Sequence, residues 1–185
     1  MRARLRGHVL GAFLTLRFRA SAARPRGLAG RFAARHRSAS WGFFLILLHI
    51  IARGKIGRSP EGELVDRYAK RLTWPVRLTE WPDTGAGKVA EPLTPHRTVL
   101  LDERGKAMSS EAFATLLGRW RDEGVRETRF MLGAADGHSD SERASADLLL
   151  AFGPATWPHL MARAMLMEQL YRATTILAGH PYHRA

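Results

Sequence analysis

The last third of the chain, residues 129–185, constrains the fold more than any other stretch. In order it has a short apolar segment, a turn with a glycine at each end, a small polar helix, a second apolar segment, a loop and one long apolar helix. The loop at residues 152–159 contains two prolines and a glycine, so it is stiff before any ligand arrives. The paired glycines of the turn let a backbone approach a ligand closely.

Upstream of this stretch, apolar segments alternate with helix signals. Strands are expected at residues 45–51, 76–81, 98–101, 129–132 and 148–152. Helices are expected after the caps Ser59-Pro60 and Ser109-Ser110, after the capping box Ser139-x-x-Glu142, and at residues 160–177. Residues 82–95 are rich in glycine and proline and predict an irregular crossover, whereas residues 102–106 are expected to close the third strand. This order predicts an α/β domain with a mostly parallel sheet flanked by helices.

The positive charge is distributed unevenly along the chain. The net charge is +12, yet no acid precedes Glu61, and ten arginines lie within the first 45 residues. Residues 1–44 are therefore expected to be a basic, disordered extension, and residues 45–185 the folded domain. Translated upstream sequence is the preferred interpretation of the extension, with a transit peptide as the alternative. A basic leader is not a basic binding face, so the high isoelectric point says little about RNA binding by the domain.

Several classes of protein are disfavoured by what the sequence lacks. The absence of cysteine excludes disulfides, thiolate zinc sites and cysteine nucleophiles, and it fits a reducing compartment such as the cytoplasm. The apolar run at residues 41–52 is shorter than the ~20 residues needed to cross a bilayer. No nucleotide-phosphate loop motif is found. His159, His180 and His183 lack the spacing of zinc ligands, so no metal is expected.

Four motifs, in this order and spacing, resemble the RlmH family of the SPOUT superfamily: the Gly133 turn, Trp157-Pro158-His159, Leu170-Tyr171-Arg172-Ala173 and His180-Pro181-Tyr182-His183-Arg184. The resemblance covers roughly residues 45–185. It implies a homodimeric methyltransferase that uses S-adenosylmethionine to methylate N3 of a pseudouridine in large-subunit (23S) ribosomal RNA. It also implies a C-terminal trefoil knot, whereas propensity alone favours an open sheet, since knots are nearly absent among folds. The turn departs from the usual Gly-Gly-Pro-Glu-Gly at Ala134, Ala135 and Asp136.

The resemblance assigns three strand ends to S-adenosylmethionine. The cofactor residues would be Leu101, Gly133, Ala134, Gly153, Pro154, Ala155, Thr156, Trp157 and Pro158. Ligands of open α/β sheets do lie beyond the carboxyl ends of strands, and backbone groups of stiff loops can recognise adenine edges. Without the resemblance, the simpler interpretation is that these glycines and prolines only shape a turn and a loop.

The resemblance places the RNA side of the site near the C-terminus. The expected substrate residues are His159, Arg163, Arg172, His180, Tyr182, His183 and Arg184. Tyr182 can stack on a base, and histidines and arginines can hold phosphates or base edges. No general base can be named. The basic loop at residues 53–58 fits a contact with RNA phosphates and an ordinary solvated loop equally well.

Two questions stay open on the sequence. The helix at residues 160–177 is apolar over so wide an arc that it must be buried on more than one side. Core packing explains this, and so does a face that packs on a second subunit, with methionines filling the interface. The alternative function is a non-catalytic RNA- or ribosome-binding protein that kept a SPOUT-like fold and lost cofactor affinity through the altered turn.

Overall fold

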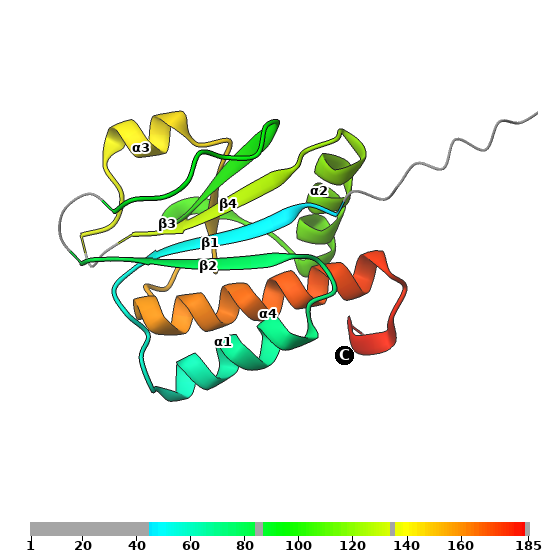
Figure 1. Cartoon of the computed structure of the whole chain (residues 1–185), viewed down its shortest axis with the longest axis horizontal. Helices are drawn as coiled ribbons and strands as arrows, with labels where there is room; N and C mark the ends of the chain where they lie inside the picture. The colour runs from blue at the N-terminus through cyan, green and yellow to red at the C-terminus, as the bar shows by residue number, and fades with distance from the viewer. Residues whose placement is uncertain (1–44, 84–86, 134–135, 184–185) are drawn as a thin grey trace, which may run out of the picture. The chain divides into compact units, whose positions relative to one another are not determined.

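The structure is a computed structural model, and it describes residues 45–83, 87–133 and 136–183. Its elements are β1 (Leu47–Arg53), α1 (Pro60–Arg71), β2 (Val76–Trp81), β3 (His96–Ala107), α2 (Ser110–Asp122), β4 (Glu127–Leu132), α3 (Asp140–Ser145), β5 (Leu148–Ala151), α4 (His159–Leu177) and the 3-10 turn η1 (Pro181–His183) (Figure 1). The expected order of strands and helices is confirmed. The prediction of a disordered extension at residues 1–44 lies outside the described residues.

The sheet has five strands in the order β2-β1-β4-β3-β5, and all neighbouring strands are parallel. The predicted α/β class with a parallel sheet flanked by helices is therefore confirmed. Because the strands are parallel, Leu101 of β3 lies beside the carboxyl ends of β4 and β5, so the three expected cofactor segments meet at one edge of the sheet. The trefoil knot stays a prediction.

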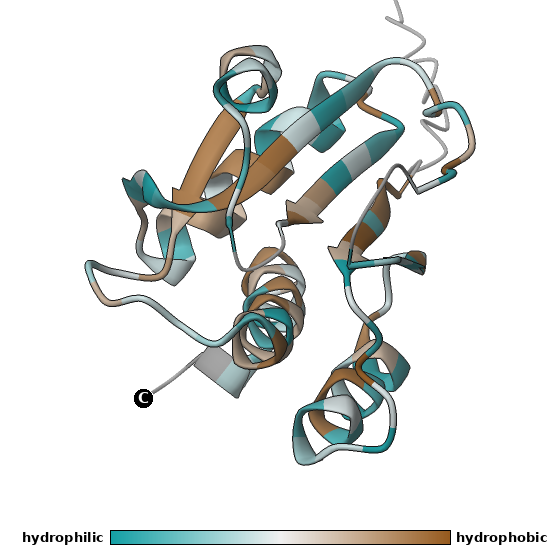
Figure 2. Ribbon diagram, turned by 90° about the vertical axis from the view of Figure 1, so that its left-hand side faces the viewer, coloured by the Kyte–Doolittle hydropathy of each residue, from teal (hydrophilic) through white to brown (hydrophobic). Residues whose placement is uncertain are grey.

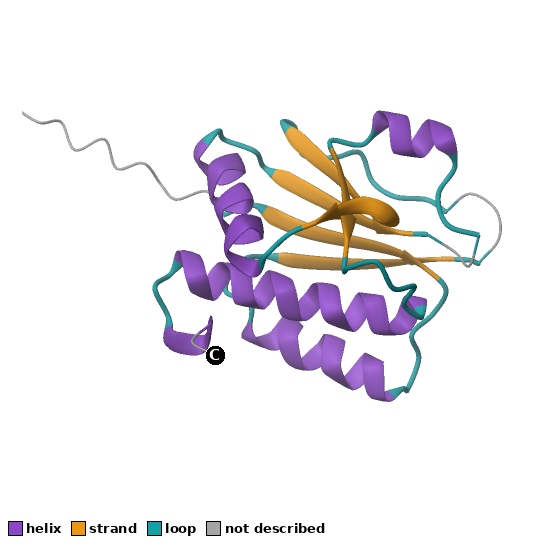
Figure 3. Ribbon diagram, turned by 180° about the vertical axis from the view of Figure 1, so that it is seen from behind, coloured by secondary structure: helices purple, strands orange, loops and turns teal. Residues whose placement is uncertain are grey.

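One face of the sheet is covered by α1, α2 and α4. Alternate residues of β1, Leu48 and Ile50, join the same buried cluster as Phe130 of β4 and residues from all three helices. Helix α4 packs against both α1 and α2, and Figure 3 shows it running beside α1. Its Leu166 and Leu170 are fully buried, at about 1.5–3 kcal/mol of stabilisation each. Core packing thus accounts for much of the wide apolar arc of α4, and Figure 2 shows the hydrophobic segments that the strands contribute.

A buried polar network starts at His49, which lies between Leu48 and Ile50 on β1 and points to the opposite face of the sheet. The His49 Nδ1–H donates to the Glu127 carboxylate at 2.8 Å, and the Thr79 hydroxyl lies 2.8 Å from Nε2. Glu127 also accepts from the Leu93 amide at 2.7 Å and from Arg129 Nε at 2.7 Å. Burial lowers the pKa of His49 despite the carboxylate beside it, so the imidazole is neutral and satisfies both contacts. The network ties three strands to the irregular crossover, which contains no helical turn at residues 87–95.

Strand β3 is longer than the sequence indicates, so the expectation that residues 102–106 close it is wrong. The Asp102 carboxylate accepts a hydrogen bond from the Arg104 amide at 2.9 Å, and the register with β5 shifts between Leu101 and Lys106. The strand then pairs with β5 again as far as Ala107. At Gly105 the two backbones touch, since an added Cβ would lie 2.7 Å from three backbone atoms of β5. Residues of this bulge also line the candidate functional site.

Candidate functional site

A pocket of about 460 Å³ lies beside the bulge of β3 and at the carboxyl end of β5. Leu101 lines it, as do five of the six expected residues of the loop after β5: Gly153, Ala155, Thr156, Trp157 and Pro158. Asp136 and Gly137 reach it from the turn after β4. Pro154 and Gly133 do not line it, and Ala134 and Ala135 lie outside the described residues. The structure therefore brings Leu101, the loop after β5 and the end of the turn after β4 to one cavity, while Gly133 of that turn lies outside its lining.

The loop after β5 is held by its own backbone and by β3. Gly153 has φ +96° with open space around it, so the backbone conformation is what requires glycine there. The Trp157 indole N–H donates to the Phe152 carbonyl at 3.2 Å, and the Thr156 hydroxyl donates to Glu103 at 3.2 Å. Helix α4 starts directly after Pro158 without a side-chain cap. These contacts set the loop around the pocket before a ligand binds.

Asp102 and Arg143 form a link that sequence reasoning missed. Arg143 Nε donates to the Asp102 carboxylate at 2.7 Å, and the Asp102 side chain is only 3% exposed. Burial raises the pKa of Asp102, but the hydrogen bonds from the Arg104 amide and from Arg143 outweigh it, so the pKa is lowered and the carboxylate is ionised. Both residues line the pocket. The bulge of β3 is thereby joined to α3. The one feature of the sequence that points to Asp102 is an acid placed directly after an apolar run.

The turn after β4 closes on itself. A Cβ at Gly133 would lie 2.8 Å from the Gly137 carbonyl oxygen, so the turn's own backbone requires glycine at 133 whether or not a ligand binds there. Gly137 has φ +74°. The capping box that follows is confirmed, because the side chains of Ser139 and Glu142 each accept from the other's amide. Next to this turn, His138 is buried, and its Nε2 has no hydrogen-bond partner among the described residues.

Two of the expected substrate residues lie on the first turns of α4, in different environments. His159 is exposed and lines the pocket. Arg163 is 0% exposed: its guanidinium donates to Glu80 at 2.6 Å and to the carbonyls of Arg53 at 3.1 Å and Gly54 at 2.9 Å. Arg163 therefore holds the start of the basic loop at residues 53–58 from inside the protein. Its direct contact with RNA stays a prediction.

The remaining substrate residues lie at the other end of α4. Tyr182 donates to Glu168 at 3.2 Å, and the Arg172 guanidinium lies 5.1 Å from the centre of the Tyr182 ring. Burial, with Glu168 nearby, raises the pKa of Tyr182, so its hydroxyl stays protonated. His180 is exposed, while the side chain of His183 and all of Arg184 lie outside the described residues. At about 1.5 Å of rise per residue, Arg172 lies about 20 Å along α4 from His159.

The part of the chain that the structure describes contains no group of three or more histidine, aspartate or glutamate side chains arranged to hold a metal ion. None of its helices combines the length and the hydrophobicity needed to span a bilayer.

Comparison with known proteins identifies the family. A family model described as "Predicted SPOUT methyltransferase" matches residues 46–183. The ribosomal RNA large subunit methyltransferase H of Erythrobacter litoralis is 76% identical over 140 residues, which cover 76% of this chain and 99% of that protein. The protein of the same name from Novosphingobium aromaticivorans is 69% identical over 140 residues, which cover 75% of this chain and 99% of that protein. The one from Bradyrhizobium diazoefficiens is 47% identical over 156 residues, which cover 74% of this chain and 98% of that protein. The predicted resemblance is confirmed, and the chain belongs to the SPOUT methyltransferase family.

Proposed function

We propose that the protein transfers a methyl group from S-adenosylmethionine to N3 of a pseudouridine in large-subunit (23S) ribosomal RNA, in the cytoplasm. The observation that carries the proposal is the pocket at the bulge of β3 and the end of β5, formed by the segments that the RlmH resemblance assigns to the cofactor. The relatives' names add the substrate class, since proteins that the chain matches over 99% of their length are called large-subunit rRNA methyltransferases.

The pocket fits S-adenosylmethionine in size and charge. Its volume of about 460 Å³ lies within the range of about 300–1,000 Å³ of small-molecule sites. Both signs of charge line it, from Asp102, Glu103, Asp136, Arg104 and Arg143, which suits a ligand with a sulfonium, an ammonium and a carboxylate. The unpartnered, buried His138 Nε2 beside the turn is a further polar group that a ligand or water can satisfy. Leu101 and the loop after β5 would hold the adenosine part.

The protein's own residues act mainly by positioning. When bound, S-adenosylmethionine supplies an electrophilic methyl group on sulfur, and the acceptor is a deprotonated N3. Holding two reactants in line contributes up to about 7–11 kcal/mol of barrier reduction. The stiff loop after β5 fixes one reactant, and we propose that His159, exposed at the pocket, contacts the target base. Further acceleration comes from donors that stabilise the negative charge on N3.

The proposal includes a homodimer. Within one subunit, Arg172, whose guanidinium lies beside the Tyr182 ring, is about 20 Å from His159 along α4. The expected substrate residues can therefore form one site only if the tail of one subunit reaches the pocket of another. The half-buried Met161 and Met165 on α4 are candidates for the shared surface. We also propose the trefoil knot that the RlmH resemblance implies.

Titration calorimetry with S-adenosylmethionine tests this proposal against a non-catalytic RNA-binding protein. We expect saturable binding, and we expect Gly153→Val to weaken it at least tenfold because the loop must leave φ +96°. Gly124→Val is the matched control, since Gly124 has φ +82°, has open space around it and lies outside the pocket. Absence of binding to the unaltered protein would favour the non-catalytic alternative.

A further inference from the structure

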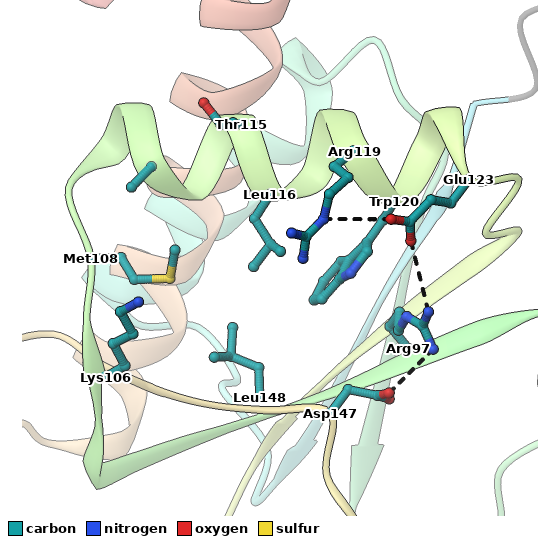
Figure 4. A pocket seen from close by; sticks show the side chains of 11 residues that line it. Arg97, Lys106, Met108, Thr115, Leu116, Arg119, Trp120, Glu123, Asp147 and Leu148 are labelled. Carbon is teal, nitrogen blue, oxygen red and sulfur yellow. Dashed lines mark hydrogen bonds and ion pairs between the residues drawn. The ribbon is translucent and has the colours of Figure 1, made fainter.

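A second hollow lies between α2 and the strands β3 and β5, and Figure 4 shows the side chains that line it. We call it the α2 groove. Its volume is about 650 Å³, larger than that of the cofactor pocket. Its apolar lining includes Met108, Leu116 of α2 and Leu148 of β5, and Arg97, Lys106 and Arg119 supply positive charge. None of these residues has a role in the cofactor site.

The cations of the groove outnumber its acids. Arg97 pairs with Asp147 at 3.3 Å and with Glu123 at 3.8 Å, and Arg119 pairs with Glu123 at 3.5 Å. The Lys106 side chain is exposed and makes no ion pair or hydrogen bond among the described residues. Ion pairs this exposed contribute only about 0–1 kcal/mol. The arginines can therefore exchange a carboxylate for a phosphate at little energetic cost, while Lys106 is already available.

The α2 groove adjoins the cofactor pocket along the same two strands. Leu148 lines the groove and Leu150 lines the pocket, two residues further along β5. On β3, Lys106 lines the groove and Arg104 lines the pocket. Two residues of a strand span only about 6.6 Å. A nucleotide next to one bound at the pocket therefore lies within reach of the groove.

We propose that the α2 groove binds nucleotides that flank the target pseudouridine. Their phosphates would contact Lys106 and Arg119, and a ribose or base would pack against Leu116 and Leu148. Phosphate contacts supply affinity and register without reading sequence, and apolar surface beneath a base is typical of single-stranded sites. The inference rests on the proposed function for its RNA substrate, and it adds a subsite outside the methyl-transfer pocket.

Charge reversal in the groove tests the inference. The variants are Lys106→Glu and Arg119→Glu, and the matched control is Lys70→Glu, an exposed lysine on α1 outside both cavities. Binding is measured to unmethylated large ribosomal subunits and to naked large-subunit RNA at several salt concentrations. We expect each groove variant to bind at least fivefold more weakly and to reduce the slope of log affinity against log salt by about 1. Affinity for S-adenosylmethionine should not change, and the control should match the unaltered protein.

Two outcomes would overturn the inference. RNA affinities of both groove variants within twofold of the control would show that the groove is not an RNA site. A change of oligomeric state in Lys106→Glu, seen by light scattering, would show instead that the groove is an interface between copies of the chain. RNA binding is read separately from methyl transfer. A protein that binds RNA through the groove but never methylates it would refute the proposed function and leave this inference standing.

Discussion

Gly105→Ala perturbs the backbone contact between β3 and β5 beside the cofactor pocket. Gly105 lies in the bulge of β3, where an added Cβ would be 2.7 Å from the Leu149 carbonyl carbon and from the backbone nitrogen and carbonyl carbon of Leu150. All three are backbone atoms, so no side chain can rotate away to make room. Leu150 and Arg104, on either side of this contact, both line the pocket. One methyl group therefore acts on the fold and on the site together.

The expected magnitude follows from this geometry. Non-bonded carbon atoms approach to about 3.5 Å at best, so the two strands must separate by about 0.8 Å to accept a Cβ at 2.7 Å. Overpacking of this kind destabilises a protein by about 1–3 kcal/mol. A displacement of about 1 Å at a positioning site lowers activity by up to about 100-fold. We expect both losses, with weaker binding of S-adenosylmethionine.

Urea unfolding and calorimetry with S-adenosylmethionine measure the two effects. Gly118→Ala is the matched control, because its Cβ would meet only the end of the Leu177 side chain, which can move, and alanine favours the helix. We expect Gly118→Ala to stay within about 0.5 kcal/mol of the unaltered protein. Gly105→Ala with unchanged stability and unchanged cofactor affinity would refute the role given to the β3 bulge.

Three further predictions concern other parts of the chain. Burial lowers the pKa of His49, so the unfolded state binds a proton before the folded state does, and the free energy of unfolding should fall as the pH drops below 6.5. His49→Gln should flatten that fall in urea unfolding between about pH 7 and 5. An unchanged pH profile in His49→Gln would contradict the neutral imidazole. Met165→Lys should shift the protein from dimer to monomer in light scattering, and a monomeric unaltered protein at micromolar concentration would remove the basis for this prediction. A chain that begins at Leu45 should fold and methylate RNA like the full chain, and circular dichroism showing loss of structure would contradict it.

Local signals were enough to predict most elements of the fold. Ser59 caps α1 through the Gly62 amide, as the Ser-Pro-Glu pattern indicates, and β2 has the predicted bounds Val76–Trp81. Strand β3 could not be predicted beyond residue 101, because the features that extend it are not local. Its bulge depends on Arg143, 41 residues away, and on backbone contact with β5 at Gly105.

The site was predictable in its loops and less so in its side chains. The loop after β5 lines the pocket because prolines and a positive-φ glycine specify its path within a few residues. Arg163 resembles a solvent-facing cation in the sequence, yet it is fully buried and its partner Glu80 lies 83 residues away. The link from Asp102 to Arg143 also joins residues far apart in sequence, 41 positions from each other. Pairings of this kind depend on which strands become neighbours, and the helical and strand periodicities do not encode that.

The central claim is methyl transfer to one base, and product analysis tests it most directly. Unmethylated large ribosomal subunits are incubated with the protein and isotopically labelled S-adenosylmethionine, and the digested RNA is analysed by mass spectrometry. We predict that the label appears on N3 of a single pseudouridine, and that Gly153→Val strongly reduces it while Gly124→Val does not. Cofactor binding without any labelled nucleotide, or label on a different base or position, would contradict the account.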